Sequence, residues 1–513
     1  MNWRIKPLAD LFAAAENKPL GRTLGAFQLV MLGVGTVIGT GIFVLSAEAA
    51  QKAGPGMMVS FVLAAFTCAF TALCYAELAS MVPLSGSAYT YSYGVLGELV
   101  AWMVGWALIL EYAVAASAVS VGWSNYFVGL LERSFGIDIP DALTRGPYVG
   151  GLINLPAVAI GLLMTALLVI GTRTSATVNA VLATIKVVAL VVFVALSVPV
   201  LQMDNFHPFA PNGFLGEISG MGIAGAAASI FFAYIGFDAV STAAEETRNP
   251  QRNMPIGVIG SLLICTLFYL LVSMGAVGAV GAQPVVDAAT GAAFEPGSPE
   301  LMVACGLPAN AQAFACSPEP LAHVISQLGW RTASQFIGLA AFLAMPAVVL
   351  MMLFGQTRIF FAMARDRLLP FNESLTRLHP RFNTPYVVTL ITGLGVTALA
   401  SVLPVGVLAD VSNTGTLFAF MTVALGVIIL RRREPDRPRP FRTPAIWVLG
   451  PLALGSCAFL FFSLSYRTKM MFVCWTLTGL VVYALYGYRK SPLRKEPGRA
   501  GLHAPSEDAS IIR

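Results

Sequence analysis

The chain has 513 residues, of which 57% are hydrophobic and only 11% are charged. A soluble domain normally carries about a quarter charged residues, so this composition excludes a water-soluble globular protein. The formal net charge of +5 says less about function than the positions of the charges, most of which lie between long apolar segments.

These apolar segments predict an all-α membrane protein of about twelve transmembrane helices, because a helix needs about 20 apolar residues to cross the hydrocarbon layer. We expect residues 1–26 to form a cytoplasmic N-terminal segment ahead of the first span. The predicted spans are 27–47, 57–81, 98–123, 151–171, 177–201, 221–244, 255–280, 332–360, 385–404, 408–430, 445–465 and 470–487.

The basic residues predict the orientation of these spans, since lysines and arginines near span ends stay in the cytoplasm. A cytoplasmic N-terminus places most of the 31 lysines and arginines inside, and twelve spans then return the tail, residues 488–513, to the cytoplasm. The basic residues predicted to lie outside are Lys52, Arg133, Arg145, Arg331, Arg467 and Lys469.

Glycine clusters fall within the first and sixth predicted spans. The sequence GVGTVIGTGIF covers residues 33–43, and AYIGFDAV covers residues 233–240. In membrane helices small residues commonly allow close packing of neighbouring helices, and this explanation fits Gly33 and Gly35.

A second explanation is that the clusters break their helices. Gly39, Thr40 and Gly41 would unwind the first span and leave amide N–H groups for an anion. Gly236 would open the sixth span and leave carbonyl groups for a cation. Two such interruptions five spans apart indicate an inverted repeat with its binding site at the bilayer midplane.

Lys186 lies roughly midway along the fifth predicted span. A charged side chain near the middle of a span costs at least about 2.5 to 3.5 kcal/mol on insertion scales, so it normally has a function. Its stem could instead snorkel to an interface, although the residue is deep for that. Burial disfavours the protonated form of a lysine, so such a group can exchange a proton near neutral pH.

Three of the carboxylates within predicted spans are further candidates. Glu77 and Asp238 could be structural, with Asp238 holding the broken sixth helix together. Glu111 could line the cavity and contact a substrate, or accept hydrogen bonds from neighbouring helices.

Cys305 and Cys316 lie in the long polar stretch 281–331, which the orientation places outside the membrane. Oxidising conditions there would allow a disulfide, and free thiols remain the alternative. The other five cysteines lie within spans, where small buried residues are the expected use of cysteine.

Four long segments carry a family resemblance: GTVIGTGIFVL at 35–45, CYAELASMVPLSGSAYTYSY at 74–93, FFAYIGFDAVSTAAEETRNPQRNMP at 231–255 and GQTRIFFAMARDRLLP at 355–370. With these segments the chain resembles the amino acid, polyamine and organocation (APC) transporter superfamily. Within it, the likeness is to bacterial members of the cationic amino acid transporter family.

This resemblance implies a transmembrane transporter domain over residues 27–487, built as a five-plus-five inverted repeat with broken helices 1 and 6 and two additional helices. Repeat one would cover about 27–201, repeat two about 221–430, and the extra helices about 445–487. It also implies a multi-pass protein of the bacterial inner membrane with both termini in the cytoplasm.

The resemblance further implies which groups bind the substrate. The carboxylate of an amino acid would meet amide groups at Gly39, Thr40 and Gly41, and its ammonium would meet carbonyls at Phe232, Ala233 and Ile235. Lys186 would couple proton movement to substrate movement. Met345 maps to a pocket position, where methionine would narrow the pocket, although ordinary helix packing is the alternative for this residue.

We therefore expect a secondary active transporter, most simply for proton-coupled uptake of small to medium neutral L-amino acids by alternating access. Transport of cationic amino acids, exchange and export remain alternatives within the carriers, and a channel or membrane receptor is the rival class. The expected partners are an amino acid, a proton and the lipid bilayer, and a small membrane subunit is left open.

An enzyme is not expected. The four histidines, His207, His323, His379 and His503, lie in predicted loops or the tail without metal or triad spacing. No nucleotide-binding P-loop is present in the sequence, so we expect no ATP-driven step, no cofactor and no nucleic acid partner.

Overall fold

The structure is a computed structural model that describes residues 24–81, 87–171, 176–237 and 247–491. These residues form helices and connecting loops, with two isolated β-bridges and no longer strand among them. Helices are expected in hydrocarbon, because every backbone polar group there must be satisfied within the protein.

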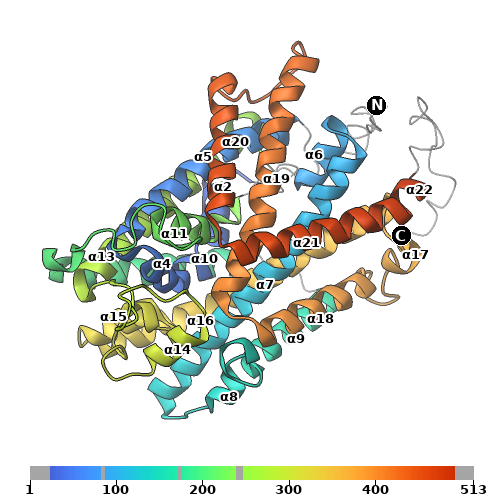
Figure 1. The fold of residues 1–513 in the computed structure, drawn as a ribbon. Coiled ribbons are helices and arrows are strands. Elements are labelled where there is room, and N and C mark those ends of the chain that lie inside the picture. Colours follow the sequence, from blue (N-terminus) through green and yellow to red (C-terminus); the bar gives the residue numbers. More distant parts are fainter. Residues whose placement is uncertain (1–23, 82–86, 172–175, 238–246, 492–513) are drawn as a thin grey trace.

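Most long helices begin and end within a few residues of the predicted spans, but the third continues to Phe135 instead of ending near residue 123. Figure 1 shows the arrangement of the elements. Those of the first part of the chain are α2 (Ala26–Val37), α3 (Thr40–Phe43), α4 (Leu45–Ala53), α5 (Met57–Met81), α6 (Ser87–Val95), α7 (Glu98–Phe135), α8 (Asp141–Thr144), α9 (Leu155–Ile170) and α10 (Ala176–Ser197). The middle part contains α11 (Gly222–Ile230), the 3-10 helix η5 (Phe231–Tyr234), α13 (Pro250–Val280), α14 (Pro299–Cys305), the 3-10 helix η7 (Phe314–Cys316) and α15 (Pro320–Gln327). The last part contains α16 (Arg331–Arg365), α17 (Asn372–Leu375), α18 (Tyr386–Val402), α19 (Val405–Arg433), α20 (Ile446–Ser463), α21 (Tyr466–Val482), the π-helical turn η8 (Tyr483–Gly487) and α22 (Tyr488–Lys490).

In the described residues, 8 helical segments are long and apolar enough to cross a membrane. Four shorter apolar helices, α2, α9, α11 with η5, and α18, coincide with the predicted first, fourth, sixth and ninth spans. The first predicted span ends later than expected, because helix resumes in α4 and continues to Ala53 instead of ending near residue 47.

Burial separates central from peripheral helices. α7 packs against both α16 and α19. The apolar window of α19 is 72% buried, whereas those of α20 and α21 are only 28% and 22% buried. The last two long helices therefore lie at the edge of the bundle, where α20 contacts α19 and α5 and α21 contacts α19 and α7.

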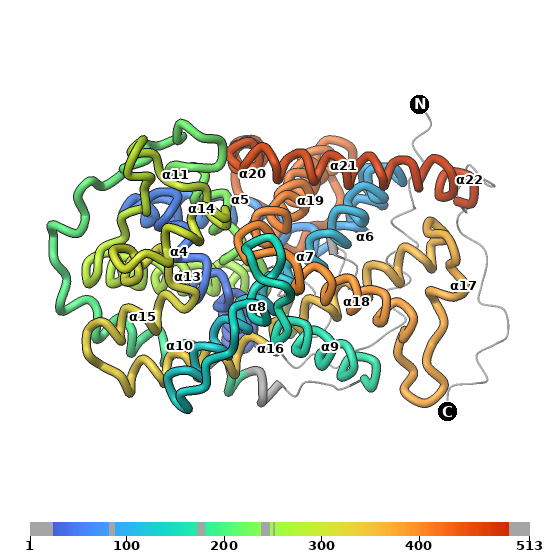
Figure 2. Tube along the Cα trace, turned by 60° about the horizontal axis from the view of Figure 1, so that its bottom comes forward, coloured from blue at the N-terminus to red at the C-terminus, as the bar shows by residue number. Residues whose placement is uncertain are grey.

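The short connecting helices gather at opposite ends of the bundle. α8, α14 and α15 lie at the bottom and lower left of Figure 1, whereas α17 and α22 lie at its right. Figure 2 again shows α14 and α15 opposite α17 and α22. The segments predicted to share the outer side, 133–150 and 281–331, are thus on one end of the molecule. We call it the loop end.

Candidate functional site

The first long apolar helix is interrupted between Val37 and Thr40. Ile38 has φ −70° and ψ 106°, and Gly39 has φ −161° and ψ −144°, so the chain is extended for two residues before α3 begins. Of the residues predicted to unwind, Gly39 does so, whereas Thr40 and Gly41 form the first turn of α3. Their amides, as the first of a helix, have no acceptor within it.

A second interruption follows α11. The helix tightens into η5, Ile235 is extended with φ −61° and ψ 135°, and Gly236 has φ +117°, a conformation that favours glycine. The last carbonyls of an α-helix lack their usual donors four residues further on, and here the Phe232 carbonyl accepts the Ile235 amide at 3.1 Å. Phe232 and Ala233, two predicted ammonium ligands, lie in this carbonyl end, and Ile235 directly follows it.

The two interruptions touch each other. A Cβ added to Gly41 would lie 2.2 Å from the Cα of Ala233, so only glycine fits at this crossing. The Thr36 hydroxyl of α2 donates a hydrogen bond to the carbonyl of Gly236 at 3.0 Å. The amide end of one half-helix is therefore beside the carbonyl end of the other.

Tyr269 of α13 joins both interruptions and was not identified from the sequence. Its hydroxyl oxygen lies 3.0 Å from the carbonyl oxygen of Val37 and 2.7 Å from that of Ala233. The side chain is fully buried. A tyrosine inside an apolar span needs a polar partner for its hydroxyl, and this need was the one sign in the sequence that Tyr269 makes a specific contact. The sequence alone does not show which partner the hydroxyl has.

Thr40 is 1% exposed, and among the described residues its hydroxyl has no hydrogen-bond partner. α7 packs closely here, because a Cβ on Gly122 would lie 2.8 Å from the Thr40 methyl carbon. One turn further along α7, the Tyr126 hydroxyl donates to the carbonyl of Phe43 at 2.7 Å. α7 therefore holds both ends of α3.

Lys186 reaches the first interruption from α10. Its Nζ atom donates to the carbonyl of Gly35 at 2.9 Å, and the residue is 2% exposed. A Cβ on Gly35 would lie 3.0 Å from the Cβ of Ala183, so Gly35 also serves the close packing expected of it. The snorkelling alternative for Lys186 is wrong, because the side chain points inward to the end of α2.

Met345 and Glu111 lie on the helices that surround the interruptions. Met345 is 1% exposed on α16, and Val348, one turn later, lies 3.7 Å from the position of a Cβ on Gly39. Glu111 is buried on α7 against α19, where its backbone carbonyl accepts a hydrogen bond from Ser412 at 3.2 Å. Substrate contact by either side chain stays a prediction, and Asp238 lies outside the described residues.

Glu77 has a structural role in this arrangement. It is 1% exposed on α5 and accepts two hydrogen bonds from the Arg431 guanidinium, at 2.7 and 2.8 Å. It also accepts the Thr443 amide at 2.8 Å. These bonds attach the end of α19 and the segment before α20 to α5.

Lys52 was expected outside the membrane, and that side stays a prediction. The residue is 3% exposed near the end of α4. Its ammonium contacts Asp410 of α19, a residue that sequence reasoning did not single out, at 2.9 Å. Hydropathy could not reveal this pair, because its members are far apart in the chain and Lys52 follows an apparently complete span.

Cys305 and Cys316 form a disulfide, with their Cα atoms 5.4 Å apart. They close a small cluster of apolar residues, Val285, Leu301 and Ala304, at the loop end. The alternative of free thiols, left open by the sequence, is wrong. Elsewhere in the described chain, no group of three or more histidine, cysteine or acidic side chains is arranged to hold a metal ion.

The long apolar helices and the fold around two interrupted helices define a multi-pass membrane protein. The family model described as amino acid permease matches residues 24–486. The chain therefore belongs to the amino acid permease family, which confirms the resemblance to the APC superfamily and the expectation of a transporter rather than an enzyme.

Related proteins extend over nearly the whole chain. It is 44% identical to the branched-chain amino acid permease BcaP of Bacillus subtilis, over 96% of this chain and 99% of that protein. It is 39% identical to the methylthioribose transporter of the same organism, over the same shares. It is also 34% identical to the chloroplastic cationic amino acid transporter 9 of Arabidopsis thaliana, over 85% of this chain and 71% of that protein.

Proposed function

We propose that this protein is a secondary active transporter that takes up branched-chain or similar apolar L-amino acids together with a proton, by alternating access. The observation that supports this most directly is the contact between Gly41 and Ala233, which brings an amide end and a carbonyl end together. Helix N-termini favour anions and carbonyl ends favour cations. An α-amino acid presents both charges a few ångströms apart.

The substrate carboxylate would accept hydrogen bonds from the amides of Thr40 and Gly41, next to Gly39. The Thr40 hydroxyl, buried without a partner in the described structure, would gain one from the same carboxylate. The ammonium would donate to carbonyls at the end of η5, among Phe232, Ala233 and Ile235.

A medium-sized apolar side chain suits the surroundings of this site. The region is lined by α16, where Met345 is buried, and Val348 lies close to Gly39. A site built for two opposite charges suits an amino acid better than methylthioribose, which lacks them. The name of the relative that is 44% identical agrees with a branched-chain substrate.

Proton coupling is assigned to Lys186. Its ammonium is buried and bonded to the Gly35 carbonyl, two residues before the interruption. Loss of the proton would remove a charge from the low-dielectric interior and weaken this bond, because a neutral amine is a poorer donor. The position of α2, and with it the amide end of the site, would thereby depend on the protonation of Lys186.

The finer architecture is also proposed. Residues 27–201 and 221–430 would form two inverted repeats, each beginning with one of the interrupted helices, and 445–487 would add two helices for a total of twelve. The loop end would face outward and both termini the cytoplasm, as the distribution of basic residues predicts.

The test is uptake by the purified protein in proteoliposomes, with the twenty amino acids and methylthioribose, with and without an imposed pH gradient. We expect saturable, stereoselective uptake of leucine, isoleucine and valine that increases when the outside is acidic. Liposomes without protein provide the background.

Other outcomes distinguish the alternatives. Uptake of arginine or lysine in place of leucine would reject the neutral substrate, and uptake only into liposomes preloaded with amino acid would indicate an exchanger. Flux that neither saturates nor distinguishes L-leucine from D-leucine would contradict the carrier and favour a channel.

A further inference from the structure

A buried network of charged and polar side chains connects α4, α11 and α19. The Lys52 ammonium lies 3.0 Å from a Glu48 oxygen and 2.9 Å from an Asp410 oxygen. It also donates a hydrogen bond to the Ser229 hydroxyl, which in turn donates to the other oxygen of Asp410. The Lys52, Glu48 and Asp410 side chains are 4%, 11% and 8% exposed. Breaking such a buried pair from one side is costly, because it leaves a charge unpaired.

Asn413 adds a second connection from α19 to α11. Its Nδ2 atom donates to the carbonyl oxygens of Ala228 and Ser229, both at 2.8 Å. These carbonyls belong to the last turn of α11, where the helix tightens into η5 and its own hydrogen bonds change. Asn413 therefore caps the half-helix whose end supplies the carbonyl part of the site.

A single stripe of α19 makes all these contacts. Gly406, Asp410 and Asn413 are four and three residues apart, so they lie on one face of the helix. At Gly406 a Cβ would lie 1.8 Å from a carboxylate oxygen of Glu48, so the Glu48 side chain lies directly against the backbone of α19 there. We call Lys52, Ser229, Asp410 and Asn413 the α19 latch.

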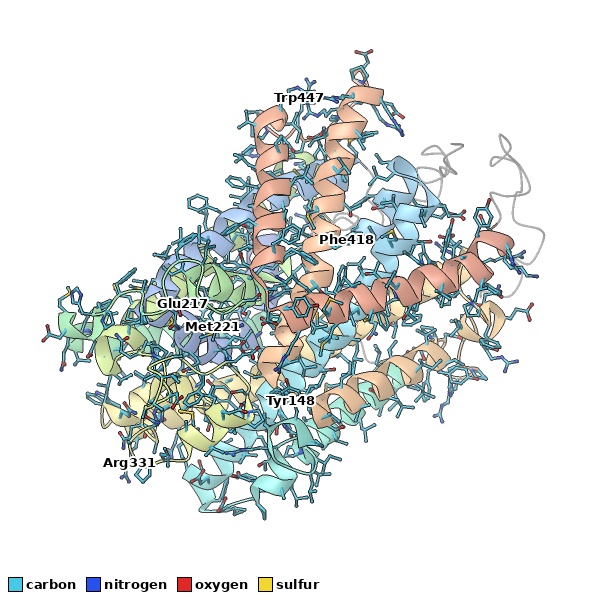
Figure 3. The ribbon with its side chains drawn as sticks, in the orientation of Figure 1. Tyr148, Glu217, Met221, Arg331, Phe418 and Trp447 are labelled. Atoms are coloured by element: carbon cyan, nitrogen blue, oxygen red, sulfur yellow. A yellow bond between two sulfur atoms is a disulfide. The ribbon has the colours of Figure 1, made fainter. Side chains whose placement is uncertain are left out.

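Two latch residues, Lys52 and Asp410, line a cavity at the loop end. The cavity is lined by Glu48, Lys52 and Asp410, together with residues of the surrounding loops, among them Tyr148, Met221 and Arg467. Tyr148 and Met221 are labelled in Figure 3 on the side of the molecule where α8 and α11 lie. A solute entering from this side would meet the latch before it could reach the interruptions at Gly39 and Gly236.

We propose that Asp410 and Asn413 position α4 and α11 in the state that is closed toward the loop end, and that a substrate enters from this side only when Lys52 and Ser229 separate from them. This inference rests on the proposed alternating access. Water from the cavity can solvate the separated charges, so the latch can open without a permanently unpaired buried charge. In a transporter that exchanges between two states, any change that stabilises one state raises the fraction of molecules in that state.

Asp410→Asn is the most informative variant. It leaves Lys52 with Glu48 as a neutral pair, whereas Lys52→Met would leave two carboxylates without their cation. Ser229→Ala is a second variant, which changes no charge and removes only the hydroxyl that links α4 to α11. Asp141→Asn is the matched control, because Asp141 pairs with Arg145 in an exposed ion pair at the same end of the molecule.

Opening is measured by labelling a cysteine at Ser46 with a membrane-impermeant thiol reagent added outside the proteoliposomes. Ser46 is 1% exposed on α4, between the first interruption and the latch residue Lys52. The background carries Cys474→Ser, because Cys474 is the exposed free cysteine of the chain. We expect Asp410→Asn to increase the labelling rate about tenfold and Ser229→Ala to increase it less, while Asp141→Asn labels at the background rate.

Leucine uptake gives the second readout. A shift toward the open state raises the fraction of protein able to bind external leucine, so the KM falls, and it slows the return step, so the kcat falls as well. A role in stability alone would reduce the amount of active protein without lowering the KM. If Asp410→Asn fails to fold, the labelling rate and the KM for leucine of Ser229→Ala test the proposal instead.

Unchanged labelling and unchanged KM in a folded latch variant would overturn the proposal, while normal uptake in that variant would leave the proposed function intact. If the unsubstituted protein showed no saturable uptake at all, the proposed function would fail. The labelling of Ser46→Cys would still support or reject the latch.

Discussion

Gly41 and Ala233 pack backbone to backbone at the crossing of the two interrupted helices, so closely that a Cβ on Gly41 would lie 2.2 Å from the Cα of Ala233. No rotamer change relieves such a contact, because the opposing atom belongs to the main chain. The distance between the amide end and the carbonyl end of the site therefore depends on the absence of a side chain at residue 41.

Gly41→Ala is expected to reduce leucine uptake at least about tenfold, because the half-helices must move apart by more than a small adjustment. The matched control is Gly395→Ala on α18, where nothing lies within 4 Å of the added Cβ and transport should be unchanged. Uptake per folded protein is the measurement. A Gly41→Ala protein with native kinetics would contradict the assignment of the site.

Much of this arrangement follows from local sequence. The positions of the spans follow from runs of apolar residues, because hydrocarbon leaves few alternatives to helices. Gly39 and Gly236 marked both interruptions, because glycine in a membrane helix has a limited set of uses. Lys186 stood out because an ion within a span is costly.

Contacts between distant segments could not be derived in this way. Tyr269 looks like any other aromatic residue of an apolar span, and its two carbonyl partners are set by the crossing of three helices. Lys52 looks like a loop residue because the first predicted span had already reached full length. Its burial depends on the continuation of the helix to Ala53 and on Asp410 from a distant helix.

Tyr269→Phe is expected to lower the free energy of unfolding by about 1 to 3 kcal/mol, since the carbonyls of Val37 and Ala233 lose their shared donor in a buried place. Thermal unfolding in detergent measures this change. Tyr466→Phe is the control, because Tyr466 is 66% exposed. Equal melting temperatures for Tyr269→Phe and Tyr466→Phe would show that the contacts of the Tyr269 hydroxyl do not stabilise the packing of the two interrupted helices.

Lys186→Met is expected to abolish the dependence of leucine uptake on an imposed pH gradient, while exchange of leucine across the membrane continues. The methionine keeps much of the length of the side chain but cannot carry the proton or donate to the Gly35 carbonyl. Lys469→Met, in which a partly exposed lysine that donates to the Phe462 carbonyl is replaced, should retain the native response. Persistence of the native pH response in Lys186→Met would remove this lysine from the coupling mechanism.

The disulfide is expected to stabilise the segment 281–331 at the loop end rather than the transport site. Replacing Cys305 and Cys316 by serine frees a short chain loop, whose closure is worth about 3 kcal/mol by chain-entropy estimates. We expect limited proteolysis to cut within residues 281–331 at least about tenfold faster, with leucine uptake near the native level. Reduction of the unsubstituted protein should reproduce this pattern, and unchanged proteolysis after either treatment would contradict it.

Met345→Ala is expected to widen the range of accepted side chains. Met345 is 1% exposed on α16, on the helix that packs near Gly39, so its truncation leaves space inside the protein. An apolar pocket distinguishes substrates by about 1 to 3 kcal/mol for each methylene. Leucine should therefore bind more weakly, with a KM raised about tenfold, while phenylalanine and arginine become better competitors.

Leu343→Ala is the control, because Leu343 is on the same helix but 43% exposed, and its truncation should change neither the KM for leucine nor the order of the competitors. If both variants keep the native order of competitors, Met345 serves helix packing, and the specificity for side-chain size has to come from other residues around the two interruptions.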